Sequence, residues 1–183
     1  MPPIPPSDIA SDMPTESPSD RSPVPYRVGI GHDTHRLEPG DSLKLGGIEI
    51  PFELSMVGHS DADVLLHAVT DALLGAAALG DIGDLYPDHD PANKGIDSAI
   101  MLQAAATKLR LHGFRIVNLD CIVFAQKPKL SDFKASIAAR IADILELDPR
   151  QVGIKAKTGE GIGDVGQLRC IQAQCVALVA RVD

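Results

Sequence analysis

The stretch that most constrains the fold is His59-Ser60-Asp61-Ala62-Asp63-Val64-Leu65-Leu66-His67-Ala68-Val69-Thr70-Asp71. Asp63, His67 and Asp71 are four positions apart, so in a helix they share one face. Apolar residues cover the other faces, which predicts a helix buried on most sides. A polar stripe on such a helix indicates a functional site.

The start of this helix is a second candidate feature. Ser60 is a favourable N-cap, and Asp63 resembles the acidic half of a capping box. Free N–H groups and the positive end of the helix dipole attract phosphate at such a position. His59 and Ser60 are therefore candidate phosphate contacts, although capping alone is an equally common role for them. The helix is expected to continue to about residue 79.

The segments around the helix alternate between strands and helices. Residues 26–31 form a short strand that ends in His32-Asp33-Thr34-His35, and the Gly46-Gly47 pair predicts a two-residue hairpin turn within residues 43–50. The Gly- and Pro-rich residues 80–91 predict an irregular binding loop. Residues 97–112 predict a second helix, which Gly113 ends.

The C-terminal half predicts three further regular elements and one loop. Residues 115–125 have the composition of a central strand. Ser131-Asp132 caps a third helix that ends near residue 147, and strands follow at 151–157 and 170–182, with the glycine-rich loop 158–166 between them. This order predicts an α+β fold, in which a mixed four-stranded sheet carries helices on one face and a small β-hairpin lies beside it.

Composition limits the classes of function. The chain has 183 residues, a net charge of −8 and three cysteines. It has no apolar run of the roughly 20 residues that a membrane-spanning helix needs, and no Lys/Arg block for nucleic acid. Three cysteines without metal-finger spacing indicate buried thiols in a reducing, cytoplasmic setting. Residues 1–25 are rich in Pro and Ser and predict a disordered leader, which leaves one domain at 26–183.

Asp33, His35 and His67 form a possible three-ligand metal set. One carboxylate and two imidazoles suit Zn²⁺, which leaves a fourth position open in catalytic sites. From spacing alone, a core histidine bonded to a main-chain carbonyl and a strand-end turn are the commoner explanations. Asp63 and Asp71 are candidates for orienting a metal-bound histidine, or simply solvent-facing carboxylates.

Two later segments could hold a charged ligand. Lys127-Pro128-Lys129 offers cations and backbone amides for a phosphate or nucleotide, although turn lysines are usually only solvated. Thr158 and Glu160, between glycines, offer oxygen ligands of the kind that Mg²⁺ prefers together with substrate phosphates. Taken alone, that loop is equally compatible with a simple turn.

Several motifs occur together in one order and spacing. They are Gly29-Ile30-Gly31-His32-Asp33-Thr34-His35, His59 to Asp63, His67 to Ala76, Gly80-Asp81-Ile82-Gly83 and Tyr86-Pro87-Asp88. With these motifs, residues 27–182 closely resemble the 2-C-methyl-D-erythritol 2,4-cyclodiphosphate synthase family of the non-mevalonate isoprenoid pathway. The resemblance implies conversion of 4-diphosphocytidyl-2-C-methyl-D-erythritol 2-phosphate into the cyclic diphosphate and CMP, by a homotrimer with active sites between subunits.

The resemblance also implies roles for individual residues. It assigns Zn²⁺ to Asp33, His35 and His67, a Mg²⁺ or Mn²⁺ ion to Glu160, and transition-state stabilisation to His59 and Thr158. The implied substrate contacts are Asp33, Thr34, His35, His59, Ser60, Asp63, Asp81, Ile82, Gly83, Tyr86, Pro87, Asp88, His89 and Asp90. The implied nucleotide pocket consists of Ala125, Gln126, Lys127, Pro128, Lys129, Leu130, Ser131, Ala156 and Lys157.

The segment from Lys157 to Arg169 departs from the family pattern. Lys157-Thr158-Gly159-Glu160 stands where many relatives have Thr-Thr-Thr-Glu, and Asp164-Val165-Gly166-Gln167-Leu168-Arg169 where Phe-Thr-Gly-Arg-Gly-Glu is common. Two alternatives to the synthase follow: a metal-binding trimer that has lost turnover, and a metal phosphohydrolase with water as nucleophile.

Overall fold

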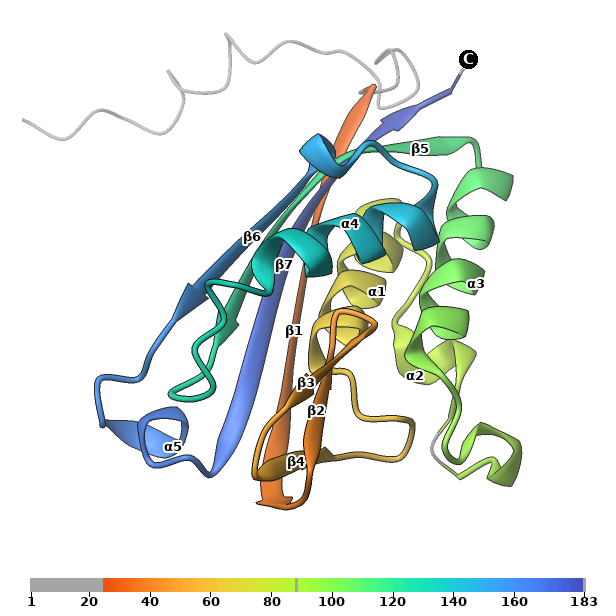
Figure 1. Ribbon diagram of the computed structural model, residues 1–183. Coiled ribbons are helices and arrows are strands. Elements are labelled where there is room, and N and C mark those ends of the chain that lie inside the picture. Colours follow the sequence, from red (N-terminus) through yellow and green to blue (C-terminus); the bar gives the residue numbers. More distant parts are fainter. Residues whose placement is uncertain (1–24, 88, 183) are drawn as a thin grey trace, which may run out of the picture.

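A five-stranded mixed sheet forms one layer of the molecule, and helices form the other (Figure 1). The computed structural model describes residues 25–87 and 89–182. The strands are β1 (Tyr26–Pro39), β4 (Leu54–Val57), β5 (Phe114–Phe124), β6 (Val152–Lys157) and β7 (Cys170–Arg181). Their order is β4-β1-β7-β5-β6; β5 and β6 are parallel, and the other neighbours are antiparallel.

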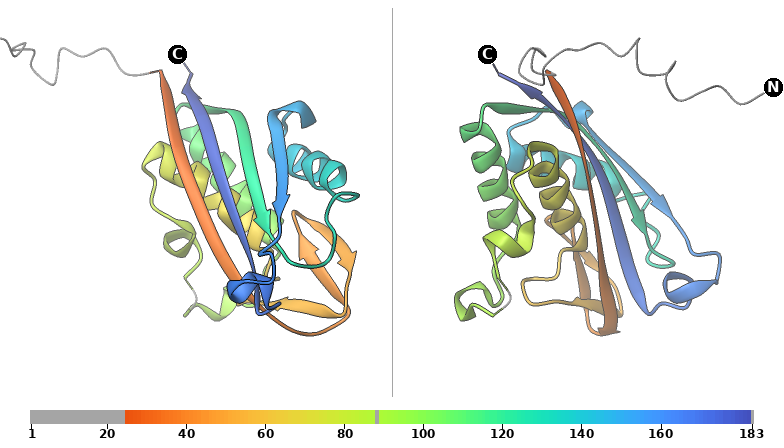
Figure 2. Two further views of the ribbon diagram at one scale, coloured as in Figure 1. Left: turned by 90° about the vertical axis from the view of Figure 1, so that its left-hand side faces the viewer. Right: turned by 180° about the vertical axis from the view of Figure 1, so that it is seen from behind.

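The three long helices lie on one face of the sheet, and the other face is open (Figure 2). They are α1 (Val64–Ala77), α3 (Ser98–Leu111) and α4 (Lys134–Leu145). A separate hairpin consists of β2 (Ser42–Leu45) and β3 (Ile48–Pro51), and shorter turns of helix are α2 (Ile82–Leu85), η3 (Pro91–Asn93), η4 (Pro149–Gln151) and α5 (Gly163–Gly166). None of the described helices has the length and apolar character needed to cross a membrane.

The core lies between the sheet and these helices. Inward-facing residues of β7 such as Ala173, Cys175 and Val179 are fully buried, as are Leu65 and Leu73 of α1. All three cysteines are free and buried, as their number and spacing predicted. The α+β class and the one-sided helix layer are therefore confirmed.

Helix α1 approaches β1 unusually closely at two glycines. A Cβ atom added to Gly29 would lie 2.0 Å from the carbonyl oxygen of Ala72, and one added to Gly31 would lie 2.0 Å from that of Ala68. Only residues without a side chain allow a helix backbone to lie this close to a strand. The Gly29-Ile30-Gly31 motif is thus a packing requirement that sets the position of α1 on the sheet.

The sheet differs from the prediction in two connected ways. It has five strands where four were predicted, because β4 pairs with the second half of β1 through partners such as Arg36 and Val57. Strand β1 also runs to Pro39, well beyond the predicted end at residue 31. The short β4 has no alternating pattern, since all four of its residues are partly buried. Its pairing is long-range, and sequence periodicity does not reveal it.

The structure confirms some of the other local predictions and contradicts others. The hairpin turn is confirmed, with φ of 62° at Gly46 and 75° at Gly47, and Gly113 ends α3 at φ 77°. The predicted cap at Ser131-Asp132 is wrong, because Phe133 precedes α4 without a side-chain cap. The irregular loop predicted over 80–91 contains α2, which Asp81 caps through a reciprocal bond with Asp84. The predicted leader lies almost wholly outside the described residues.

We expect Gly31→Ala to destabilise the protein by about 1–3 kcal/mol or more, because the added methyl group meets helix backbone that cannot rotate away. Urea unfolding at a fixed protein concentration measures the change. Gly75→Ala in α1 is the matched control: its nearest neighbour would be 3.9 Å away, and alanine favours a helix by up to about 1 kcal/mol. Equal stability of the two variants would show that the close approach is not required.

Candidate active site

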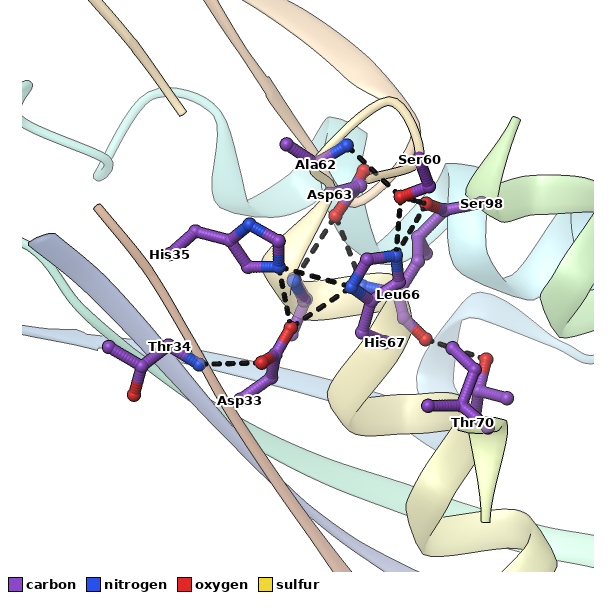
Figure 3. Close-up of polar contacts among 12 residues, drawn as sticks. Asp33, Thr34, His35, Ser60, Ala62, Asp63, Leu66, His67, Thr70 and Ser98 are labelled. Carbon is purple, nitrogen blue, oxygen red and sulfur yellow. Dashed lines mark hydrogen bonds and ion pairs between the residues drawn. The ribbon is translucent and has the colours of Figure 1, made fainter. Parts of the chain in front are cut away.

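Three potential metal ligands converge between β1 and the first turns of α1 (Figure 3). His35 Nε2 lies 2.8 Å from Asp33 Oδ2, His67 Nδ1 lies 3.0 Å from the same oxygen, and the two nitrogens are 3.2 Å apart. Asp33 and His35 point the same way because they are two apart on one strand, toward the face that α1 covers. The predicted convergence of these residues is confirmed.

The outer nitrogens of both imidazoles also have partners. His35 Nδ1 lies 2.9 Å from the Val57 carbonyl oxygen, which can only accept, so Nδ1 carries a proton; in the neutral imidazole, Nε2 then presents a lone pair to the cluster. His67 Nε2 lies 2.8 Å from Ser98 Oγ and 2.9 Å from Ser60 Oγ. The predicted alternative for His67, a main-chain carbonyl partner, is not what the structure shows.

The geometry of the cluster fits a tetrahedral metal ion. Ligand atoms at about 2.0–2.1 Å from a tetrahedral Zn²⁺ lie roughly 3.3 Å from one another, close to the separations of 2.8–3.2 Å seen here. A carboxylate facing nitrogen lone pairs repels them unless a cation lies between the groups. The donor set therefore suits a cation with one coordination position left for another ligand.

The electrostatics of the cluster also favour positive charge. Burial opposes ionisation of Asp33, but hydrogen bonds with His35 and His67 outweigh it and lower the pKa of Asp33 far below its ordinary value. Burial also opposes the charged form of His35, yet the bond to Asp33 raises the pKa of His35 above its ordinary value. The site thus holds a fixed negative charge and stabilises a cation beside it.

A cavity of about 340 Å³ opens beside the cluster. Ten predicted residues line it: Asp33, Thr34, His35, His59, Ser60, His67, Asp71, Ile82, Gly83 and Tyr86. Asp81, Pro87, His89 and Asp90 are not among the lining residues, and Asp88 lies outside the described part of the chain. Val57, Asn93, Ile96 and Met101 also line the cavity and were missed, because nothing in their local sequence distinguishes them from core or loop residues.

The predicted role of Asp63 as a substrate contact is wrong. Its side chain is fully buried, and its oxygens accept from the backbone N–H groups of Gly46, Gly47, Leu65 and Leu66 at 2.7–3.2 Å. Burial raises the pKa of Asp63, and these N–H groups oppose that rise. Asp63 is therefore the N-cap of α1 and also joins the β2–β3 hairpin to the helix.

The start of α1 differs from the prediction. Because α1 begins after Asp63, the predicted N-cap at Ser60 is wrong, and the carboxylate of Asp63 occupies N–H groups of the first turn. His59 and Ser60 still line the cavity, but through their own side chains. Asp71 does not orient a histidine, because its Oδ1 accepts from Ile82 N at 2.8 Å and so holds the start of α2. Burial raises the pKa of Asp71.

The predicted nucleotide residues form a separate cavity of about 240 Å³. It is lined by Ala125, Gln126, Pro128, Lys129, Leu130, Ser131, Lys134, Ala156, Lys157 and Thr158, so Lys127 is the one predicted residue that does not line it. In the same loop, Thr158 Oγ1 donates to Glu160 Oε1 at 2.7 Å, and both residues are exposed.

The two cavities lie on opposite sides of the sheet centre. Asp33 pairs with Ala173, Ala173 with Val123, and Val123 with Ala156, so these residues form one row across four strands. At about 4.8 Å between neighbouring strands, Asp33 and Ala156 are separated by about 14 Å. The metal-ligand triad and the predicted nucleotide pocket therefore do not meet within one chain.

Comparison with known proteins agrees with this geometry. Residues 26–180 match the YgbB family. The 2-C-methyl-D-erythritol 2,4-cyclodiphosphate synthase of Dechloromonas aromatica is 52% identical over 157 residues, which cover 86% of this chain and 98% of that protein. The bifunctional enzyme IspD/IspF of Albidiferax ferrireducens is 51% identical over 160 residues, 87% of this chain and 38% of its own.

Solved structures show the same fold. A structure of 2C-methyl-D-erythritol-2,4-cyclodiphosphate synthase superimposes with a TM-score of 0.77 and 37% identity, covering 84% of this chain and 99% of the other. A CDP complex of IspF from Plasmodium falciparum gives a TM-score of 0.77 and 32% identity, covering 87% and 98%. The chain therefore belongs to the YgbB family, the family of the 2-C-methyl-D-erythritol 2,4-cyclodiphosphate synthases.

Proposed function

We propose that this protein cyclises 4-diphosphocytidyl-2-C-methyl-D-erythritol 2-phosphate to 2-C-methyl-D-erythritol 2,4-cyclodiphosphate and releases CMP. An oxygen of the 2-phosphate attacks the β-phosphorus of the same molecule, and the bond from that phosphorus to the CMP oxygen breaks. Because attacking and leaving groups belong to one substrate, no side-chain nucleophile is needed. The main task of the protein is to hold the highly charged substrate in a bent conformation, in which the attacking oxygen, the phosphorus and the leaving oxygen are in line.

The observation that carries this proposal is the triad of Asp33, His35 and His67 at the wall of a polar cavity, in a chain of this family. A Zn²⁺ ion held there would supply positive charge to the phosphate oxygens through its free position. His59 and Ser60 line the same wall and would orient the phosphates, while Ile82, Gly83 and Tyr86 would enclose the erythritol and limit the access of water.

The second cavity supports a nucleotide site. Lys129 and Lys157 flank a pocket that Ala125, Ala156 and Thr158 also line, a combination suited to a cytosine ring and its phosphates. We assign a Mg²⁺ or Mn²⁺ ion to Glu160, because these ions take few protein ligands and share substrate phosphates. Thr158, which bonds Glu160, would act on the same phosphates.

The open face of the sheet supports a homotrimer with sites shared between subunits. Val28 is 67% exposed, Ile30 63% and Val176 40%, and Ile30 pairs directly with Val176 across β1 and β7. Apolar side chains gathered on an open sheet face are typical of a subunit interface. A neighbouring subunit would also bring its nucleotide pocket to the triad, from which the pocket of the same chain is about 14 Å away.

Phosphorus NMR with the cytidyl substrate tests the activity. Formation of the cyclic diphosphate together with CMP is the expected result. Open-chain hydrolysis products would instead indicate a phosphohydrolase, and an unchanged substrate in the presence of both metals would indicate a binding protein without turnover. Either of these results would overturn the proposed function.

We expect His67→Ala to lower Zn²⁺ affinity more than 100-fold and to abolish turnover, because even the partners of metal ligands contribute about 10–100-fold. Chelator competition and metal analysis measure the affinity. His112→Ala is the control, since His112 is exposed and its Nδ1 contacts only the Lys108 carbonyl at the end of α3. A His67 variant that stays active without zinc would contradict the ligand assignment.

We expect Ile30→Lys to convert the trimer into monomers, because a charge would be buried at the centre of the apolar interface. Light scattering after gel filtration gives the mass. Ile100→Lys is the matched control: Ile100 is 55% exposed, but it lies on α3, on the other side of the molecule from the open sheet face. Loss of assembly in both variants, or in neither, would argue against this interface.

A further inference from the structure

A chain of polar contacts leads away from the metal-ligand triad and begins at the contact between His67 and Ser98 (Figure 3). His67 Nε2 lies 2.8 Å from Ser98 Oγ, and Ser98 Oγ contacts Asp61 Oδ1. The backbone N–H of Ser98 also donates to Asp61 Oδ2 at 3.1 Å. Asp61 Oδ2 in turn lies 2.5 Å from the Lys44 ammonium group. None of Lys44, Asp61 and Ser98 lines the cavity, and the sequence did not predict them as partners of His67.

The order of donors in this chain follows from its chemistry. The Asp61 carboxylate, paired with Lys44, only accepts hydrogen bonds, so the Ser98 hydroxyl must give it its single proton. The Ser98 oxygen can then only accept, from His67 Nε2 and from the Ser60 hydroxyl 3.4 Å away. Nε2 of His67 therefore carries a proton, so that in the neutral imidazole the lone pair lies on Nδ1, which faces Asp33 and His35.

We propose that Ser98 and Asp61 are positioning residues that hold His67 in the tautomer able to bind metal. This inference rests on the proposed metal-dependent function and adds residues that act through the ligand. Ser98 is fully buried and begins α3, whereas the Asp61 side chain is 16% exposed and lies in the loop before α1. Lys44 of strand β2 holds the other end of this series of contacts. It also lies 3.2 Å from Asp97, at the start of α3.

Ser60 is the competing partner of His67, at 2.9 Å from Nε2. Its hydroxyl lines the cavity and accepts from the Ala62 N–H at 3.2 Å, but no carboxylate fixes the direction of its proton. It can therefore accept from Nε2 or donate to it. Ser98, bound to a carboxylate, has only one possibility, so Ser98 decides the tautomer and leaves Ser60 available for substrate.

Two variants test the assignment without any substrate. Ser98→Ala removes the acceptor for Nε2, and Asp61→Ala frees the Ser98 proton to turn toward His67. We expect each to lower Zn²⁺ affinity about 10–100-fold, the usual effect of losing a partner of a metal ligand. Ser98→Thr retains the hydroxyl and is expected to restore affinity. Chelator competition measures these values.

Nitrogen NMR of the metal-free protein provides the readout that a merely structural role would not change. The His67 ring signals, identified by their absence in His67→Ala, are expected to show a proton on Nε2 in the wild type, also where Nδ1 is protonated beside Asp33, and less protonation of Nε2 in both variants. Ser55→Ala is the matched control, because it removes one partly buried serine hydroxyl that donates to the Ser42 carbonyl oxygen away from the site.

Three results would overturn the proposal. The first is a wild-type His67 without a proton on Nε2. The second is a zinc affinity within twofold of the wild-type value in both variants. The third is an equal loss of affinity in Ser55→Ala. These results are separate from the cyclisation assay. If the wild type made no cyclic diphosphate but Ser98→Ala and Asp61→Ala weakened zinc binding, the proposed activity would fail and the positioning role would stand.

Discussion

The close approach of α1 to β1 is the constraint on which the rest of the structure depends. Gly29 and Gly31 have no side chains, so the helix backbone lies directly on the strand at Ala72 and Ala68. Since inward-facing residues of a strand alternate, Asp33 and His35 follow the two glycines on the same face. His67, one residue before Ala68, then lies opposite them. The close packing of α1 on β1 therefore also brings the three candidate metal ligands together.

The site combines groups that would repel one another without help. A carboxylate and imidazole nitrogens point at a common centre, and the protein fixes them from behind. The Val57 carbonyl holds His35, and Ser98 contacts His67. Asp63 joins the start of α1 to the β2–β3 hairpin through four N–H groups. Such outer contacts keep ligands in place before a cation arrives, which lowers the cost of binding it.

The two faces of the sheet have different surroundings. One face carries the helices and the core, whereas the open face exposes Val28, Ile30 and Val176. Within one chain, the triad and the pocket around Lys129 and Lys157 are separated by the width of two intervening strands. In the proposed homotrimer, the interface that buries the apolar face would also bring the two half-sites together around one nucleoside diphosphate substrate.

The sequence by itself determined the α+β class, the Gly46-Gly47 hairpin, helix α3 and the candidate ligand set of Asp33, His35 and His67. These features depend on local patterns: glycine at positive φ, an aspartate cap, and alternation along a strand. The motifs in their order also indicated the family.

Tertiary structure decided what local patterns leave open. Ser60 and Asp63 are both good helix caps, and the N–H groups of a hairpin up to 17 positions away favoured Asp63. Strand β4, the full length of β1 and the Ser98–Asp61–Lys44 chain likewise depend on contacts between distant segments, which form only when the backbone has folded.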